Sequence, residues 1–198
     1  MKKKFNTKVI HSGHGPDKET GAVMPPIHLS STFKQMEPGN FEYEYARTKN
    51  PSRDVLEKLL AQIESGDKAF AFASGMSAIN TVCDLFGTNY HIVCSDDVYG
   101  GTRRLFDKVK SNIDVTYIDF DKNINWNDEI KENTKFIWIE TPSNPLMKII
   151  DIKNTVNIAS EFKLPVICDN TFASPYMERQ MCYHCLLYTS DAADDNAG

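Results

Sequence analysis

The chain of 198 residues contains no hydrophobic run that approaches the roughly 20 apolar residues needed to cross a bilayer. Its basic start, Met1-Lys2-Lys3-Lys4, is not followed by an apolar segment, so we expect no secretory signal. The net charge is -5, so the chain also lacks the basic excess with which proteins neutralise nucleic-acid phosphates. These absences predict a cytoplasmic globular protein that binds neither membranes nor nucleic acids.

Motifs for nucleotides and for metals are missing as well. Neither Gly-x-Gly-x-x-Gly nor a Walker pattern follows a predicted strand. This counts against a nucleotide-binding oxidoreductase on a doubly wound sheet, which stays an alternative. Cys182 and Cys185 form a Cys-x-x-Cys pair, but no second pair completes a zinc site, so we expect no metal. Cys83, Cys94 and Cys168 lie in apolar segments and are interpreted as core thiols.

The chain divides into three segments of different character. Residues 1–50 are rich in Gly, Pro, Ser and Thr without regular periodicity, which predicts an N-terminal arm that packs on something else, such as a partner subunit. Residues 51–180 have the periodicity of a packed α/β protein and are interpreted as part of a large domain. Residues 181–198 have no such periodicity and end in small and acidic residues, so we interpret them as a non-native tail.

The middle segment begins with an amphipathic helix and continues with short apolar runs. The helix is expected to start at Ser52 as its N-cap and to stop at Gly66. The runs predict strands at 69–73, 91–94, 115–118, 136–139 and 165–168, at intervals of roughly 20 to 30 residues that leave room for crossover helices. The predicted fold class is therefore α/β, with a mostly parallel sheet covered by helices on both faces.

Ligands of such sheets bind beyond the carboxyl ends of the strands, so the residues that follow each strand predict the site. Glycines, an aromatic ring, an amide and carboxylates stand at these positions. They are Ser74-Gly75-Met76, Asp96 to Thr102 with Tyr99 among them, Glu140 to Pro145 with Asn144 among them, and Asp169-Asn170-Thr171.

Two of these groups point to a charged, phosphorylated ligand. Gly75 lets the backbone approach closely, and the helix start at Met76 presents N–H groups to an anion such as a phosphate; the alternative is a tight turn that binds nothing. Asp169 ends a buried strand and needs a cationic partner, for which a protonated pyridine nitrogen is suitable. The alternative for Asp169 is a cap of the turn that follows.

The other groups suit a planar ring, although each also has a simpler interpretation. Tyr99 can stack on a cofactor or pack under its loop. Asn144 can direct its amide at a ring oxygen or form a turn, and Glu140 can brace the same loop or cap it. Arg47 can clamp a phosphate or lie exposed, and Arg104 can bind a carboxylate or solvate its helix.

The order of these motifs resembles the Cys/Met-metabolism family of pyridoxal-5′-phosphate (PLP) enzymes, whose fold is the aminotransferase-like fold type I. The resemblance runs from about Val9 to Tyr176, so the large domain is expected to be truncated here. The motifs that carry it are Pro25-Pro26-Ile27, Tyr45 to Pro51, Phe72 to Met76, Asp97 to Thr102, Trp138 to Pro145 and Asp169 to Tyr176.

The resemblance implies a role for each matching position. Gly75 and Met76 correspond to backbone donors to the PLP phosphate, and Tyr45 and Arg47 to a pair that reaches the phosphate of a neighbouring subunit. Tyr99 corresponds to the stacking and proton-transferring tyrosine. Asn144 corresponds to a ligand of the ring hydroxyl, and Asp169 to the partner of the pyridine nitrogen. Thr171 is assigned to cofactor binding, and Arg47, Tyr99 and Arg104 to the substrate.

The family also forms a Schiff base with a lysine beyond the Asp-Asn-Thr motif, but this chain has no lysine after Lys163. We therefore expect an inactive fragment of an active parent, which the resemblance implies to be a homodimer or homotetramer. Gly101 disfavours methionine γ-lyase, and the motifs favour cystathionine γ-lyase or γ-synthase. Cystathionine β-lyase, O-acetylhomoserine sulfhydrylase and a non-catalytic PLP-binding fragment stay alternatives. Expected substrates are cystathionine, O-acylhomoserine or cysteine.

Overall fold

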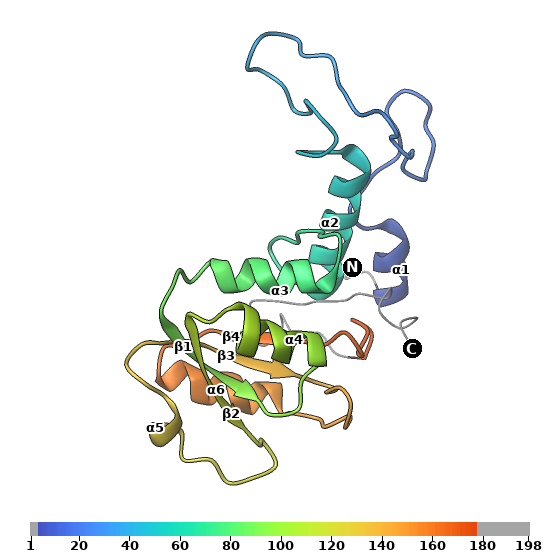
Figure 1. Cartoon of the computed structure of the whole chain (residues 1–198). Coiled ribbons are helices and arrows are strands. Elements are labelled where there is room, and N and C mark those ends of the chain that lie inside the picture. Colours follow the sequence, from blue (N-terminus) through green and yellow to red (C-terminus); the bar gives the residue numbers. More distant parts are fainter. Residues whose placement is uncertain (1–3, 178–198) are drawn as a thin grey trace. The chain divides into compact units, whose positions relative to one another are not determined.

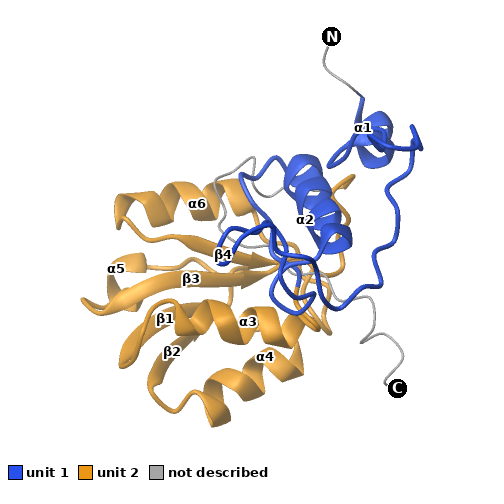
Figure 2. Cartoon of the chain, turned by 90° about the horizontal axis from the view of Figure 1, so that it is seen from above, with its two compact units in different colours: residues 1–71 blue, residues 72–198 orange. Residues whose placement is uncertain are grey.

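The computed structural model describes residues 4–177 and divides the chain into two compact units, residues 1–71 and residues 72–198 (Figure 2). The division into an arm of residues 1–50, a partial domain of residues 51–180 and a tail stays a prediction, and the segment 181–198 lies outside the described residues. Within residues 4–177, no helix is long and apolar enough to cross a membrane.

The first unit contains helices α1 (Phe5–His11) and α2 (Pro51–Glu64). The predicted helix is confirmed as α2, but Asn50 rather than Ser52 caps it, because the Asn50 side chain accepts the Ser52 N–H at 2.8 Å. Pro51 at the first helical position needs no hydrogen-bond partner for its nitrogen. The helix ends at Glu64, and its C-cap is Ser65 rather than the predicted stop Gly66; Ser65 adopts a left-handed conformation with φ of 65°. Helix α1 was not predicted, since residues 1–50 were expected to form an irregular arm.

The second unit is built on a parallel four-stranded sheet (Figure 1). Its strands are β1 (Tyr90–Ser95), β2 (Ile113–Ile118), β3 (Thr134–Glu140) and β4 (Val166–Asp169), in the order β2-β1-β3-β4. Four of the five predicted strands and the α/β class are thus confirmed. The strand predicted at residues 69–73 is wrong: the Ala71 N–H donates to Glu57 Oε1 at 2.9 Å, and none of the described strands pairs with this segment. A strand needs a neighbour for its backbone groups.

Helices cover both faces of the sheet because successive strand residues point to opposite sides. Helix α3 (Gly75–Asp84), helix α4 (Gly100–Arg104) and the π-helical turn η1 (Leu105–Val109) cover one face, and α6 (Ile152–Glu161) covers the other (Figures 1 and 2). The short helix α5 (Trp126–Glu129) lies between β2 and β3. Along β3, Phe136 and Trp138 pack under α3 and η1, whereas Ile137 and Ile139 pack against α6.

The strand order reverses between β1 and β3. The chain leaves β1 through α4 on one face toward β2, and leaves β3 through α6 on the opposite face toward β4. When the connections of two neighbouring parallel strands leave toward opposite faces, a crevice opens between their loops at the carboxyl edge of the sheet. Ligands of open α/β sheets bind in this crevice. The loops after β1 and β3 therefore border the expected binding crevice.

A buried histidine joins three strands in the core. The His91 side chain is fully buried, with Nδ1 2.7 Å from Thr134 Oγ1 and Nε2 2.9 Å from Thr116 Oγ1. Burial lowers the pKa of His91, and the nearby Lys131 ammonium lowers it further, against the opposing effect of Asp114. The folded protein therefore resists protonation of this ring, which the unfolded chain does not.

We expect this histidine to make the fold sensitive to acid. Because the folded-state pKa lies below the unfolded value, the unfolded chain binds more protons as the pH falls from about 7.5 to about 5.5, and His91 lowers the free energy of unfolding by at most about 1.4 kcal/mol per pH unit. Urea unfolding at both pH values checks this. Glu140, whose pKa is raised by burial, contributes a dependence of the opposite sign, so the two variants are compared with each other. The free energy of unfolding should fall less on acidification in His91→Gln than in the exposed-site control His28→Gln; an equal dependence in both variants would contradict the assignment.

Candidate functional site

The first turn of α3 forms one wall of the candidate site. Ser74 is the N-cap, and its Oγ accepts the Ser77 N–H at 3.2 Å. The helix begins at Gly75, one residue before the predicted start, and runs for 10 residues. The backbone N–H groups of a first helical turn lie outside the intrahelical ladder, at the positive end of the helix dipole, and so can receive an anion.

Tyr99 lies directly over Gly101. An added Cβ at Gly101 would stand 2.4 Å from Tyr99 Cε1 and 3.0 Å from Met76 Sδ, so only glycine permits this approach. The ring of Tyr99 is half-buried and therefore retains an accessible surface. Gly101 thus brings the aromatic ring that follows β1 next to the first turn of α3.

Glu140, the last residue of β3, joins the loops after β1 and β3. Its Oε2 accepts the Tyr99 N–H at 2.8 Å, and its Oε1 accepts the Asn144 N–H at 2.9 Å. The side chain is only 4% exposed. Burial raises the pKa of Glu140 to about 8, and the charges of Asp169 and Asp97 add to the increase, whereas the two N–H donors oppose it. The predicted bracing role of Glu140 therefore has a geometric basis.

Asp169 ends β4 beside Glu140, its register partner on β3. The carboxylate is 3% exposed, and its Oδ1 accepts both the Thr171 N–H at 3.1 Å and the Thr171 hydroxyl at 2.7 Å. These two bonds orient the carboxylate and leave Oδ2 for another donor. A buried carboxylate held in this way suits a cationic N–H group.

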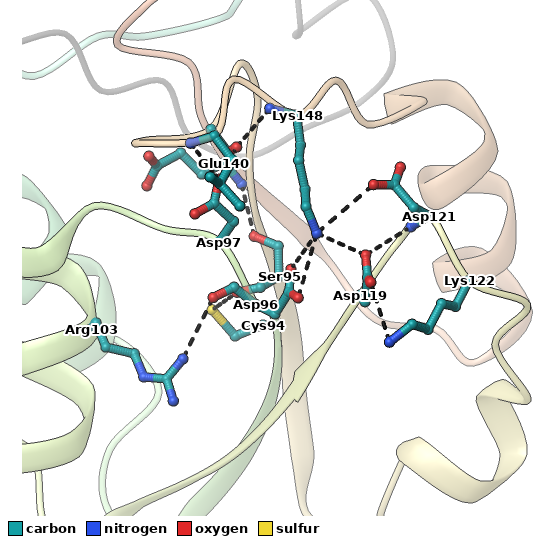
Figure 3. A network of polar contacts seen from close by, with 12 residues as sticks. Cys94, Ser95, Asp96, Asp97, Arg103, Asp119, Asp121, Lys122, Glu140 and Lys148 are labelled. Atoms are coloured by element: carbon teal, nitrogen blue, oxygen red, sulfur yellow. Dashed lines mark hydrogen bonds and ion pairs between the residues drawn. The ribbon is translucent and has the colours of Figure 1, made fainter.

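The loop that carries Asn144 is fastened to the sheet by a further set of carboxylates (Figure 3). Lys148 Nζ lies 2.8 Å from Asp119 Oδ1, 3.2 Å from Asp96 Oδ1 and 3.8 Å from Asp121 Oδ2. The Asp119 carboxylate raises the pKa of Lys148 through its hydrogen bond, so the ammonium stays charged. These pairs tie the loop after β3 to the residues that follow β1 and β2.

Asp97 fastens the same loop at a second point. It accepts the Ser143 hydroxyl and the Leu146 N–H, the latter at 3.0 Å. Asp119 and Lys148 were not singled out from the sequence, although Asp119 directly follows β2 and the strand-end rule applies to it equally. No sequence pattern points to Lys148, because its role arises from the approach of three separate strand ends.

The structure brings most of the predicted site residues of the second unit together at the carboxyl edge of the sheet. Met76 and Tyr99 both lie against Gly101. Glu140 accepts the N–H groups of Tyr99 and Asn144. Glu140 is also the register partner of Asp169, which accepts the Thr171 hydroxyl. Arg104 lies at the end of α4 and is exposed.

The first unit holds the other two predicted residues. There the Arg47 guanidinium lies 4.9 Å from the centre of the Tyr45 ring, so these two residues are paired within their own unit.

This arrangement fits the group that the sequence resemblance implies. PLP needs three kinds of partner, and all three are present here. A helix N-terminus suits its phosphate, a tyrosine ring can stack on its pyridine, and a buried carboxylate suits its protonated ring nitrogen. By contrast, no group of three or more potential ligands for a metal ion occurs among residues 4–177. The edge of the sheet is therefore suited to an organic phosphate with a cationic ring.

Comparison with known proteins supports this interpretation. Residues 6–188 match the family model described as "Cys/Met metabolism PLP-dependent enzyme". The chain is 42% identical to a cystathionine beta-lyase of Coxiella burnetii, covering 91% of this chain and 48% of the relative. It is 43% identical to a probable cystathionine gamma-synthase of Herpetosiphon aurantiacus, covering 88% of this chain and 56% of the relative.

A solved structure agrees with these relatives. The crystal structure of cystathionine gamma-lyase from Lactobacillus plantarum complexed with L-serine superposes with a TM-score of 0.88 at 43% identity, over 94% of this chain and 49% of that protein. The chain thus spans about half the length of the proteins it matches, and its fold is that of PLP enzymes of fold type I, as expected. The match over residues 6–188 establishes that this chain belongs to the Cys/Met metabolism PLP-dependent enzyme family.

Proposed function

We propose that the chain is the PLP-binding half of a transsulfuration enzyme of the cystathionine γ-lyase or γ-synthase type. The convergence of Tyr99, Asn144 and Asp169 with the first turn of α3 carries the proposal. Cystathionine β-lyase stays an alternative because the relatives include β-lyases as well as γ-enzymes. O-acetylhomoserine sulfhydrylase stays an alternative from the sequence motifs. The substrate is then a small amino acid such as cystathionine, an O-acylhomoserine or cysteine, and the enzyme works in the cytoplasm.

Each strand-end residue has a task in this proposal. The backbone N–H groups of Gly75 and Met76 bind the cofactor phosphate, and the Tyr99 ring stacks on the pyridine. The Asn144 amide binds the ring hydroxyl. Asp169, oriented by Thr171, holds a proton on the pyridine nitrogen. Bound PLP then supplies an electron sink for the substrate amino acid.

The remaining residues are assigned to the substrate and to a second subunit. Arg104 is exposed and able to bind a substrate carboxylate as a bidentate donor. Tyr45 and Arg47 form a cationic aromatic pair, which we assign to the phosphate of a partner subunit and to the substrate. The proposed full enzyme is accordingly a homodimer or homotetramer in which each site draws on two chains.

The first test removes the negative charge at the end of β4. Asp169→Asn should weaken binding of 4′-deoxypyridoxine 5′-phosphate, a PLP analogue without the aldehyde, because a charge-assisted hydrogen bond is lost; at about 1.5–3 kcal/mol this is roughly 10- to 100-fold. Calorimetric titration of the 198-residue chain measures it. The exposed control Asp128→Asn should bind like the parent. Equal affinity in Asp169→Asn would argue against the pyridine assignment.

The second test uses two adjacent glycines. Gly101→Ala must displace the Tyr99 ring, whereas a Cβ at Gly100 meets no atom within 4 Å. We expect Gly101→Ala to weaken binding of the same analogue by about tenfold, because the loss of one aromatic contact costs about 1.4 kcal/mol. Gly100→Ala should leave the affinity unchanged. Competition by inorganic phosphate should be similar in both variants. A parallel loss in the two variants would show that Tyr99 does not stack on the ring.

The third test concerns the lysine expected beyond Asp169-Asn170-Thr171, since the last lysine of the chain is Lys163. Without that amine the aldehyde of PLP forms no covalent bond with the chain and adds nothing to the affinity. PLP and 4′-deoxypyridoxine 5′-phosphate should therefore bind this chain with affinities within about threefold of each other. Competition titration compares them directly. Binding of PLP more than about tenfold tighter would instead assign covalent capture to a lysine within the 198 residues.

A further inference from the structure

The carboxylate of Glu140 spans the place where the strand order reverses. The loop after β1 leaves toward α4 on one face, and the loop after β3 leads to α6 on the other. Yet one N–H group from each loop, that of Tyr99 and that of Asn144, reaches a different oxygen of this one side chain. The Glu140 carboxylate therefore links Tyr99 in one loop with Asn144 in the other.

The geometry calls for a carboxylate in particular. Two N–H donors approach the two oxygens at 2.8 and 2.9 Å, and an ionised carboxylate has an acceptor at each position. The isosteric glutamine has only one acceptor oxygen, and its NH₂ group would face the second N–H donor. A buried donor left without its acceptor destabilises the arrangement, so one of the two loops would move.

Glu140 itself is closed off from the ligand side by its own bonds. It is 4% exposed, and its backbone N–H donates to Ser95 Oγ at 3.2 Å, which fixes it to the end of β1 as well. The side chain that would contact a stacked ring is that of Tyr99, and the one that would contact a ring substituent is that of Asn144. Glu140 thus acts on a ligand only through these two residues.

We propose that Glu140 is a positioning residue, which holds the Tyr99 ring and the Asn144 amide at the separation that recognises the 3-hydroxyl group of a stacked pyridine. This inference rests on the proposed function, since that function supplies the ring. It adds a specificity determinant that lies outside contact with the ligand.

The ionisation of Glu140 can be followed through its effect on its two hydrogen bonds. Asp169 at the end of β4 and Asp97 after β1 face it with negative charge, and the Cys94 thiol of β1 lies nearby. Burial raises the pKa of Cys94 far above its usual range, so that thiol stays neutral. The pKa of Glu140 is raised to about 8, so the hydrogen bonds to Tyr99 and Asn144 should strengthen together as the pH rises through that value.

Amide NMR of the ligand-free 198-residue chain tests the coupling. The Tyr99 and Asn144 N–H resonances should move downfield with one shared midpoint, and Glu140→Gln should abolish the movement in both, whereas the exposed control Glu132→Gln should preserve it. Separate midpoints for the two amides, or no titration of either, would overturn the proposed coupling. This measurement on the parent chain is decisive even if Glu140→Gln fails to fold.

Two ligands then test recognition of the ring. Above about pH 8, where Glu140 is ionised, Glu140→Gln should weaken 4′-deoxypyridoxine 5′-phosphate by about tenfold, equivalent to about 1.4 kcal/mol, and should change the affinity of its 3-deoxy counterpart by less than about threefold. Adding Asn144→Ala should remove the difference, because both residues act on the same contact. Equal losses for the two ligands would reduce Glu140 to a structural role and overturn the proposal.

The two hypotheses fail in different ways. If the parent chain binds neither ligand, the proposed function fails together with the ring recognition, while the amide titration still decides whether Glu140 couples the loops. If the parent binds both ligands equally and the amides titrate separately, the cofactor assignment survives and the role of Glu140 is refuted.

Discussion

The candidate site depends on the convergence of two backbone N–H groups on the buried carboxylate of Glu140. This interaction fixes Tyr99 and Asn144 relative to each other in two loops that leave the sheet toward opposite faces, in addition to the links that Asp97 and Lys148 make between the same loops. Burial disfavours the ionised form of Glu140 and raises its pKa, while the two N–H donors favour it. The structure thus places a buried carboxyl group, ionised only above about pH 8, at the point where the sheet topology opens a crevice.

The same edge of the sheet is built almost entirely from acidic groups held by donors of the chain itself. Asp169 is oriented by Thr171, Asp97 accepts from Ser143 and Leu146, and the carboxylates around Lys148 surround its ammonium. Each carboxylate that accepts hydrogen bonds or ion pairs from donors of the chain holds a loop in position. Thr171 contacts one oxygen of the Asp169 carboxylate. The other oxygen is the proposed acceptor for the pyridine N–H group of the cofactor.

Much of this site could be predicted from the order of residues along the chain. A carboxylate, an amide or an aromatic residue after a buried apolar run implies a strand-end position, and Tyr99, Asn144 and Asp169 were found in this way. The rule failed for residues 69–73, because an apolar run forms a strand only where a neighbour accepts its hydrogen bonds. It overlooked Lys148, whose three carboxylate partners follow two other strands, Asp96 after β1 and Asp119 and Asp121 after β2.

The sequence by itself determined the fold class, the strand-end residues and the family, since periodicity and motif order are local properties of the chain. Only the tertiary structure decided that Glu140 joins two loops, that Gly101 makes room for the Tyr99 ring, and that Lys148 fastens the Asn144 loop. The physical reason is that hydrogen bonds and close packing depend on distances in space, which bring together residues far apart along the chain, such as Glu140 and Tyr99 at a separation of 41 and Lys148 and Asp119 at 29. The strand order sets those distances.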